Sequence, residues 1–349
     1  KALEDNTTAS NNTAVGFESL AANTTGSNSA FGKAALTANT TGTGNNAFGI
    51  QCQNGTTTGN FNTAMGHVTM FTNTTGADNS AFGGQAMYST TTGANNTAMG
   101  STALYANTTG ASNVAVGVQS LRLSTTASNN VAVGFQSGRA LTTGAGNVFL
   151  GHEVGQNNVE VTTGADNIAI GFHARLNAAD AANQMVMGKQ VTCQGNNQFT
   201  FGNGATDSNI VFGETSISAP SDERYKEDIA ASTAGLSFIK DLRPVTFKWK
   251  KEKDVPSGHD AYVEGSDTRV MNSSGETNHG FIAQEVKAAI DNHSELKDGF
   301  RMWAVDERDT TNGRQRVADG ALVPMLVKAI QELSTTLDVA LARIATLEG

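Results

Sequence analysis

A short pattern of apolar and polar positions recurs along the first two thirds of the chain. An apolar residue followed by glycine returns mostly every 17 residues, with one step of 20 and a shortening to 14 and 11 near the end. The glycines of this pattern are Gly16, Gly32, Gly49, Gly66, Gly83, Gly100, Gly117, Gly134, Gly151, Gly171, Gly188, Gly202 and Gly213. Two residues before the glycine stands mostly alanine, and four before it stands asparagine in eleven of the thirteen repeats. A fixed period of this kind indicates a repeat architecture.

The repeat predicts a parallel β-solenoid, and therefore a mainly β fold. A period of about 17 residues holds two short strands and two turns, which is too short for a helical hairpin or a propeller blade. The density of Gly, Asn and Thr excludes helix. Thr-Thr-Gly triplets such as the one ending at Gly42 supply turn chemistry between the strands. Stacked asparagines, as at Asn45 and Asn62, predict a ladder of side-chain amides.

The core of each coil is small, so the sequence predicts self-association. A coil offers about two large apolar side chains, each worth roughly 1.5 to 3 kcal/mol when buried. Oligomerisation is the usual remedy for a chain with so little core per residue. The alanine column, for example Ala30, Ala47 and Ala64, predicts coils packed closely around a common axis.

Residues 12–20 (NTAVGFESL) and 28–36 (NSAFGKAAL) resemble the head repeats of trimeric autotransporter adhesins. The resemblance covers about residues 10–175 and fades through 215. It implies a left-handed parallel β-roll of three chains, and a surface-exposed shaft that binds a receptor. We therefore assign residues 1–215 to a β-solenoid fibre or adhesin head.

The composition changes near residue 220. Residues 1–220 carry six Lys/Arg and ten Asp/Glu, whereas residues 221–349 carry 17 and 22. The change predicts a domain boundary, with 216–220 as a linker. Beyond it the pattern is mixed α and β: residues 242–250 alternate as a strand does, and 279–286 read as a strand running into a helix. The polar residues 253–278 between them fit an exposed arm.

The last segment, 321–349, has the apolar spacing of a coiled-coil helix. Apolar residues alternate at steps of three and four from Leu326 to Leu347. A helix packed within a globular domain is the alternative. The second domain, 221–349, is therefore expected to be α+β and to end in a long helix.

Three motifs and the terminal helix together resemble the C-terminal intramolecular chaperone of endosialidase-type phage tailspikes. The motifs are SDERYK at 221–226, RPVTF at 243–247 and GFIAQEV at 280–286, and the resemblance spans residues 221–349. Tyr225 stands where that family more often has Leu. The resemblance implies a domain that trimerises its parent chain, helps a β-structured fibre to register and fold, and then cuts itself off before the motif serine.

Carried over to this chain, the resemblance makes Ser221 the nucleophile and Lys226 its general base, with Asp222 and Arg224 as supporting residues. The bond cleaved would be Pro220–Ser221, in a single turnover. A lysine serves as a base only when desolvation or a neighbouring positive charge lowers its pKa, and Arg224 could supply that charge. By spacing alone, Ser221 followed by two acidic residues also fits the N-cap of a short helix.

These features together predict a homotrimeric adhesive fibre tip, from a phage tail fibre or a bacterial cell surface, with an attached chaperone. Its expected partners are further copies of itself and an extracellular glycan or protein receptor. The rival interpretation is a polysaccharide-degrading tailspike, which usually needs two carboxylates roughly 5 to 9.5 Å apart. Glu153, Glu160 and Asp166 form the one acidic cluster of the solenoid, in the long repeat, which reads more simply as a protruding loop.

No cofactor or metal site is predicted. Three histidines lie just after repeat glycines and could be ladder positions, meet their symmetry mates or bind an ion: His67, His152 and His173. Three phenylalanines follow repeat glycines directly and could form a receptor patch or fill a core between coils: Phe17, Phe135 and Phe172.

Charge and hydropathy exclude two further classes. A net charge of -9 gives no electrostatic footprint for nucleic acid. No segment approaches the roughly 18 apolar residues of a membrane span. Cys52 and Cys193 lie far apart in different repeats and suggest no disulfide framework.

Overall fold

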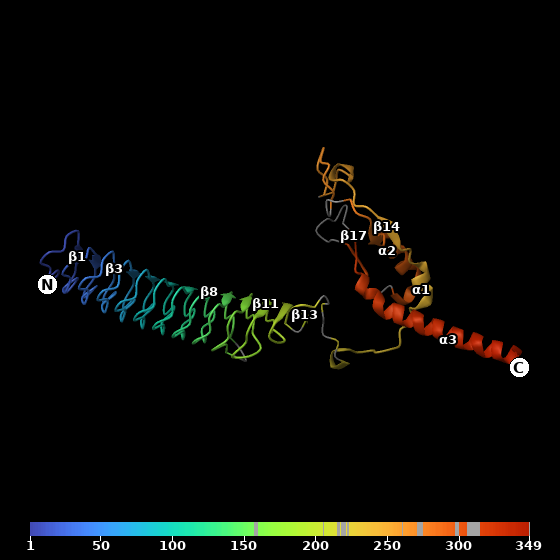
Figure 1. Ribbon diagram of the computed structural model, residues 1–349, viewed down its shortest axis with the longest axis horizontal. Coiled ribbons are helices and arrows are strands. Elements are labelled where there is room, and N and C mark those ends of the chain that lie inside the picture. Colours follow the sequence, from blue (N-terminus) through green and yellow to red (C-terminus); the bar gives the residue numbers. More distant parts are fainter. Residues whose placement is uncertain are drawn as a thin grey trace. The chain divides into compact units, whose positions relative to one another are not determined.

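The computed structural model forms two compact units, Lys1–Asp222 and Glu223–Gly349 (Figure 1). It describes the 349-residue chain except for residues 157–159, 205, 215–216, 218–220, 222, 260, 271–274, 297–299, 306–314 and 349, and the side chain of Tyr225.

The first unit is a parallel β-solenoid with coils of about 17 residues, as the repeat predicts. One strand of each coil enters a single 13-stranded sheet in which the strands follow one another in chain order. The strands are β1 Thr13–Val15, β2 Ser29–Phe31, β3 Asn46–Phe48, β4 Thr63–Met65, β5 Ser80–Phe82, β6 Thr97–Met99, β7 Val114–Val116, β8 Val131–Val133, β9 Val148–Leu150, β10 Ile168–Ile170, β11 Gln184–Lys189, β12 Gln198–Asn203 and β13 Thr206–Val211. β13 runs antiparallel to β12 and ends the sheet.

Equivalent residues of successive coils lie directly beside one another. Ala30 pairs with Ala14 on one side and Ala47 on the other, and the same register continues up the ladder. A position of the repeat therefore becomes a column along the solenoid, and its chemistry is repeated at each strand spacing.

The asparagine column forms the predicted amide ladder. The side-chain oxygen of Asn79 accepts hydrogen bonds from the backbone N–H of Asn96 at 3.0 Å and from its Nδ2 at 3.1 Å. Asn96 Nδ2 also donates to the carbonyl of Gly110 at 2.9 Å. The pattern recurs from coil to coil, and it joins the column to the turn of the next coil.

The alanine column does not face a common axis, so that prediction was wrong. Ala30, Ala47 and Ala64 have no exposed surface, because they point into the interior of the chain's own solenoid. Space there is filled by a second column, four residues after the repeat glycine, which includes Leu20, Leu36, Met70, Met87, Leu104 and Leu121. The small alanine is needed because the large side chain of this second column occupies the same thin interior.

The repeat glycine sets how closely the coils approach. Gly100 has a φ of +138°, which residues with a side chain rarely adopt, and a Cβ there would lie 2.5 Å from the carbonyl oxygen of Gly117. Neither the backbone angle nor the spacing between coils therefore permits a residue with a side chain at this position.

The second unit combines short strands with three α-helices among its described residues. Its elements are η1 Glu223–Tyr225, α1 Leu236–Asp241, β14 Val245–Phe247, η2 Glu252–Asp254, β15 Asn278–Gly280, α2 Ala283–Asn292, η3 Ser294–Leu296, β16 Trp303–Val305, β17 Gln315–Val317, η4 Asp319–Leu322 and α3 Val323–Glu348. β14 pairs antiparallel with β15, and β16 with β17.

Helix α1 contacts both other described α-helices of this unit, α2 and α3. Phe238 of α1 is fully buried and packs with Val286 and Ile290 of α2 in one core. The first backbone N–H of α1, at Leu236, donates to a carboxylate oxygen of Glu332 in α3 at 2.8 Å. This contact holds α1 against the first half of the long helix, and most of α3 remains exposed.

Candidate processing site and association surfaces

The predicted catalytic segment lies where the two compact units are divided. Ser221, Arg224 and Lys226 are all exposed, and Arg224 lies in the single turn η1. The backbone N–H of Lys226 donates to the carbonyl of Glu223 at 3.0 Å, which closes this turn. The predicted residues Pro220 and Asp222 lie outside the described residues.

The other two motifs meet each other in the fold. Arg243 forms a two-pronged ion pair with Glu285, in which Arg243 Nε donates to Glu285 Oε2 at 3.0 Å and Arg243 Nη2 donates to Oε1. Beside this pair, Val245 of β14 lies opposite Gly280 of β15. Arg243 lowers the pKa of the Glu285 carboxyl, mainly through its hydrogen bonds. The motifs at 243–247 and 280–286 therefore form one structural element.

His293 connects three elements of the same unit. Its Nε2 lies 2.9 Å from Asp241 Oδ2 at the end of α1, and its Nδ1 lies 3.1 Å from Glu295 Oε1 in η3. The ring packs edge-on against Phe238 at 5.4 Å. The hydrogen bond to Asp241, followed by that to Glu295, raises the pKa of His293. A charged imidazole is favoured here because it donates to two carboxylates at once. Sequence reasoning did not select this residue.

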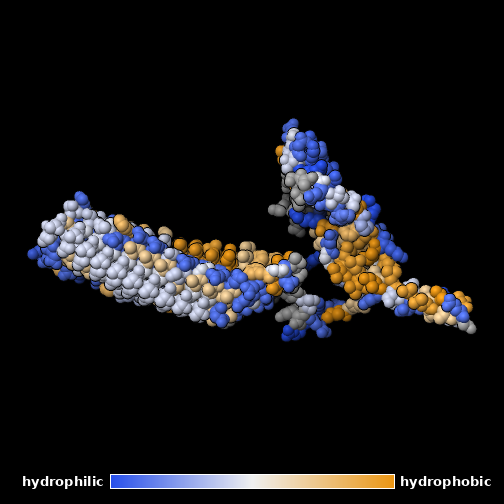
Figure 2. All heavy atoms as spheres, viewed as in Figure 1, coloured by the Kyte–Doolittle hydropathy of each residue, from blue (hydrophilic) through white to orange (hydrophobic). Residues whose placement is uncertain are grey.

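The outer face of the solenoid sheet exposes a row of apolar side chains. The residue before each repeat glycine points outward, and Val15, Met99 and Met187 keep 55%, 46% and 46% of their surface exposed. From β7 to β10 the first residue of each strand is apolar too, so both outward positions are apolar. Figure 2 shows these residues as a row along the edge of the solenoid that carries the labels β8 and β11 in Figure 1. A continuous row of this kind marks an interaction surface.

Helix α3 presents a second apolar surface. Ile330 and Leu337 are 64% and 59% exposed, and Leu326, Leu333 and Ile344 are also exposed. They share one stripe because their spacing alternates between three and four residues. An exposed apolar stripe with this spacing is typical of helices that pack against one another. No helix among the described residues is long and apolar enough to cross a membrane.

The acidic cluster of the long repeat is divided between different partners. Glu153 Oε2 lies 3.1 Å from His173 Nε2, and Glu160 Oε1 lies 3.9 Å from Arg139 Nη1. The three phenylalanines raised by the sequence, Phe17, Phe135 and Phe172, are exposed and not part of a core. The contact between Glu153 and His173 was not predicted from the sequence, although each of these residues stands two positions after a repeat glycine.

Comparison with known families identifies the start of the second unit. Residues 221–295 match the family model described as chaperone of endosialidase. The solenoid lies outside this match, and its resemblance to adhesin head repeats is not supported by it. Neither the curated proteins nor the solved structures gave a significant match. The chain thus carries a parallel β-solenoid followed by a segment, 221–295, that is similar to the chaperone of endosialidase.

Proposed function

We propose that this chain is a homotrimeric adhesive fibre segment, located outside the cell on a virion tail or a bacterial surface, that carries its own folding chaperone. The observation that carries the proposal is the family match, which begins at Ser221, directly after a repeat solenoid. A chaperone domain attached to the end of a long repeat is expected to act on that repeat. The solenoid would be the part that binds a cell-surface glycan or protein.

The two apolar surfaces support self-association. Burying the exposed half of one outward side chain, such as Met99 or Val133, is worth roughly 1 kcal/mol. The row contributes one such side chain or more per coil, so the gain accumulates along the solenoid. Exposed leucines along α3 add a seam at the other end of the chain. Three copies would cover both surfaces, because the same columns occur in each copy.

The proposed chaperone solves a problem of register. The columns of the solenoid repeat in each coil, so three chains displaced by a whole coil would still bring the same outward apolar position of one chain against that of the next. Long-range parallel pairing also folds slowly. A trimeric domain at one end would align the three chains before the coils form. Once formed, the shaft would be held by its barrier to unfolding after the domain leaves.

Self-cleavage would proceed at Pro220–Ser221 by an acyl transfer. Ser221 Oγ attacks the carbonyl carbon of Pro220 while Lys226 Nζ takes the hydroxyl proton. The carbon–nitrogen bond then breaks, and the proton is delivered to the leaving amine of Ser221. Water hydrolyses the resulting ester, which leaves a carboxylate on Pro220 and restores the Ser221 hydroxyl. Asp222 and Arg224 would orient these groups.

The exposure of Lys226 suggests when this reaction occurs. A lysine acts as a base only after burial or a neighbouring positive charge favours its neutral form. Lys226 is exposed on the single chain. A second chain packed over the segment would supply the burial, so cleavage would follow assembly and would not precede it.

Denaturing electrophoresis tests the peptidase part of the proposal. The wild-type chain should yield two fragments, while Ser221→Ala and Lys226→Ala should each leave one intact band. Ser232→Ala and Lys240→Ala, which change the same residue types within the second unit, should cleave as the wild type does. An intact wild-type band under native assembly conditions would remove the peptidase claim.

Light scattering tests the trimer independently. Ser221→Ala should still have the mass of three chains, because its folding does not depend on cleavage. A single-chain mass would refute the fibre proposal itself, whatever the electrophoresis shows. Incubation with capsular polysaccharides, followed by a reducing-end assay, separates adhesion from depolymerisation, and we expect no new reducing ends.

A further inference from the structure

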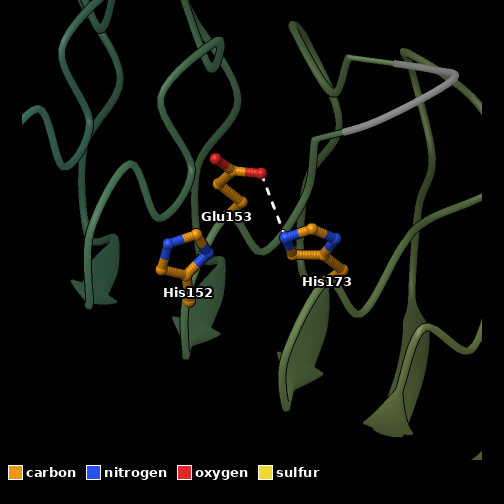
Figure 3. A group of neighbouring side chains, drawn as sticks. All are labelled: His152, Glu153 and His173. Atoms are coloured by element: carbon orange, nitrogen blue, oxygen red, sulfur yellow. Dashed lines mark ion pairs between the residues drawn. The ribbon is translucent and has the colours of Figure 1, made fainter.

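Two histidines and a glutamate converge on the solenoid surface where the coil period lengthens from 17 to 20 residues. His152 and Glu153 follow Gly151 at the end of β9, and His173 comes two residues after Gly171 at the end of β10. One ligand atom of each residue lies within 4.8 Å of the other two. Figure 3 shows the Glu153 carboxylate above the two rings, with a nitrogen of each ring turned toward the other residues.

The coil register produces this arrangement. Leu150 pairs with Ile170, so the residues two positions after the repeat glycines fall in one column. Glu153 and His173 are neighbours in that column, and His173 Nε2 lies 3.1 Å from Glu153 Oε2. The backbone holds both in place, since His173 N donates to the carbonyl of His152 at 3.0 Å and Glu153 N donates to that of Phe135 at 2.9 Å.

Aromatic neighbours orient the two imidazoles. The ring of His152 stacks between Phe135 and Phe172 at centroid distances of 5.1 and 5.3 Å. The ring of His173 stacks on Phe172 at 4.0 Å. Stacking covers ring faces and leaves ring nitrogens at the edges. The side chains of His173 and Glu153 remain 20% and 25% exposed, so an ion can reach them from solvent.

We propose that His152, Glu153 and His173 bind a divalent transition-metal ion of the zinc class. Two imidazoles and one carboxylate are a ligand set that zinc uses, with a fourth position left for water. Bonds of about 2.0 to 2.2 Å place neighbouring ligand atoms of a tetrahedral site roughly 3.3 Å apart. The Glu153–His173 pair meets this spacing already, and the His152 nitrogen, which lies within 4.8 Å of both, would move closer on binding. Calcium and magnesium prefer sites made of oxygen ligands.

The ion would act as a staple between two coils. His152 and Glu153 belong to one coil and His173 to the next, so binding links them at the step where the repeat is interrupted. An ion that binds the folded solenoid and not the unfolded chain raises the free energy of unfolding. The open position could also take a carboxylate or another anionic group from a bound molecule.

The repeat itself supplies substitutions that should fold. Gln occupies the position of Glu153 and His173 in neighbouring coils, at Gln136 and Gln190. Phe occupies the position of His152 in the coils before and after it. The test variants are therefore Glu153→Gln, His173→Gln and His152→Phe. The matched control is His67→Phe: His67 is exposed at the same repeat position as His152, but Val68 follows it.

Calorimetric titration with Zn²⁺ on the full chain, prepared without a histidine tag, should detect one ion per chain that depends on this cluster. Each test variant should weaken this binding by more than about 10-fold, the smallest loss expected when a group that supports a metal is removed. His67→Phe should bind as the wild type does. Co²⁺ should give visible absorption bands in the wild type and in the control, and lose them in His173→Gln.

Two results would overturn the proposal. One is wild-type Zn²⁺ binding that equals that of the triple variant with all three substitutions. The other is a wild type that binds Zn²⁺ but keeps the same melting temperature, since an ion that links two coils must stabilise the folded solenoid. Far-UV circular dichroism of each variant verifies that its solenoid has formed.

Discussion

Removing one rung of the amide ladder is a direct test of what holds the solenoid together. Asn96 is 1% exposed and makes four side-chain hydrogen bonds. Its Nδ2 donates to Asn79 Oδ1 at 3.1 Å and to the carbonyl of Gly110 at 2.9 Å. Its Oδ1 accepts from the backbone N–H of Asn113 at 2.9 Å and from Asn113 Nδ2 at 3.1 Å. Asn96→Ala removes all four.

The cost follows from which partners are left without a bond. Asn79 Oδ1, the Gly110 carbonyl and Asn113 Nδ2 each keep one other hydrogen bond. The backbone N–H of Asn113 loses its partner in the buried ladder. At about 1 kcal/mol per hydrogen bond, the loss of all four lowers the free energy of unfolding by about 4 kcal/mol. The smallest decrease expected is about 2 kcal/mol, most of it from the backbone N–H of Asn113 that is left without a partner.

Guanidinium unfolding followed by circular dichroism measures this loss, and amide hydrogen exchange at Asn113 locates it. Exchange at that amide should accelerate in Asn96→Ala. Thr92→Ala, an exposed change in the same coil, should stay within about 0.5 kcal/mol of the wild type. If Asn96→Ala unfolds like Thr92→Ala and the Asn113 amide stays protected, the ladder does not stabilise the fold as argued.

Three further predictions follow from single residues. Gly100→Ala should disrupt pairing with the next coil, because its Cβ would lie 2.5 Å from the carbonyl oxygen of Gly117 at a φ of +138°. Thermal melting followed by the circular dichroism signal of the strands checks this: the variant should melt well below the wild-type temperature, and an equal melting temperature would contradict the prediction. The bond to Asp241 raises the pKa of His293 above its ordinary 6.5, so its contribution to the stability of the second unit should be complete below pH 6.5 and fall as pH rises through the raised pKa; His293→Gln should flatten that pH dependence, and an unchanged slope would refute it. Burial raises the pKa of Cys52 to about 12, so a thiol reagent at pH 8 should label it only as fast as the chain unfolds, which rapid labelling of the native protein would disprove.

The sequence reveals which residues share a column, but not which way each column points. The asparagine column was predictable because an amide stacked on itself has one favourable arrangement. The alanine column was not, because a small residue fits both a thin interior and a close contact between chains. The deciding information was the second column at Leu20 and Leu36, whose bulk fills the interior opposite the alanine.

The candidate sites show a similar division. The motifs around Arg243 and Glu285 could be read as parts of one domain, while their ion pair required the fold. Glu153 and His173 are separated by 20 residues instead of 17, so a fixed period hides their contact. Counting from the repeat glycine would have revealed it. His293 gave no sequence signal, because its partners Asp241 and Glu295 are brought to it by the packing of α1 and η3.

The uniform columns also affect how the length of the shaft can change. Neighbouring coils carry nearly the same residues in each column, so loss or duplication of one coil by recombination would leave every column continuous. The reach of the solenoid would then vary in increments of about 4.8 Å, one strand spacing each. Lineages could therefore lengthen or shorten the solenoid while keeping the same surface along it.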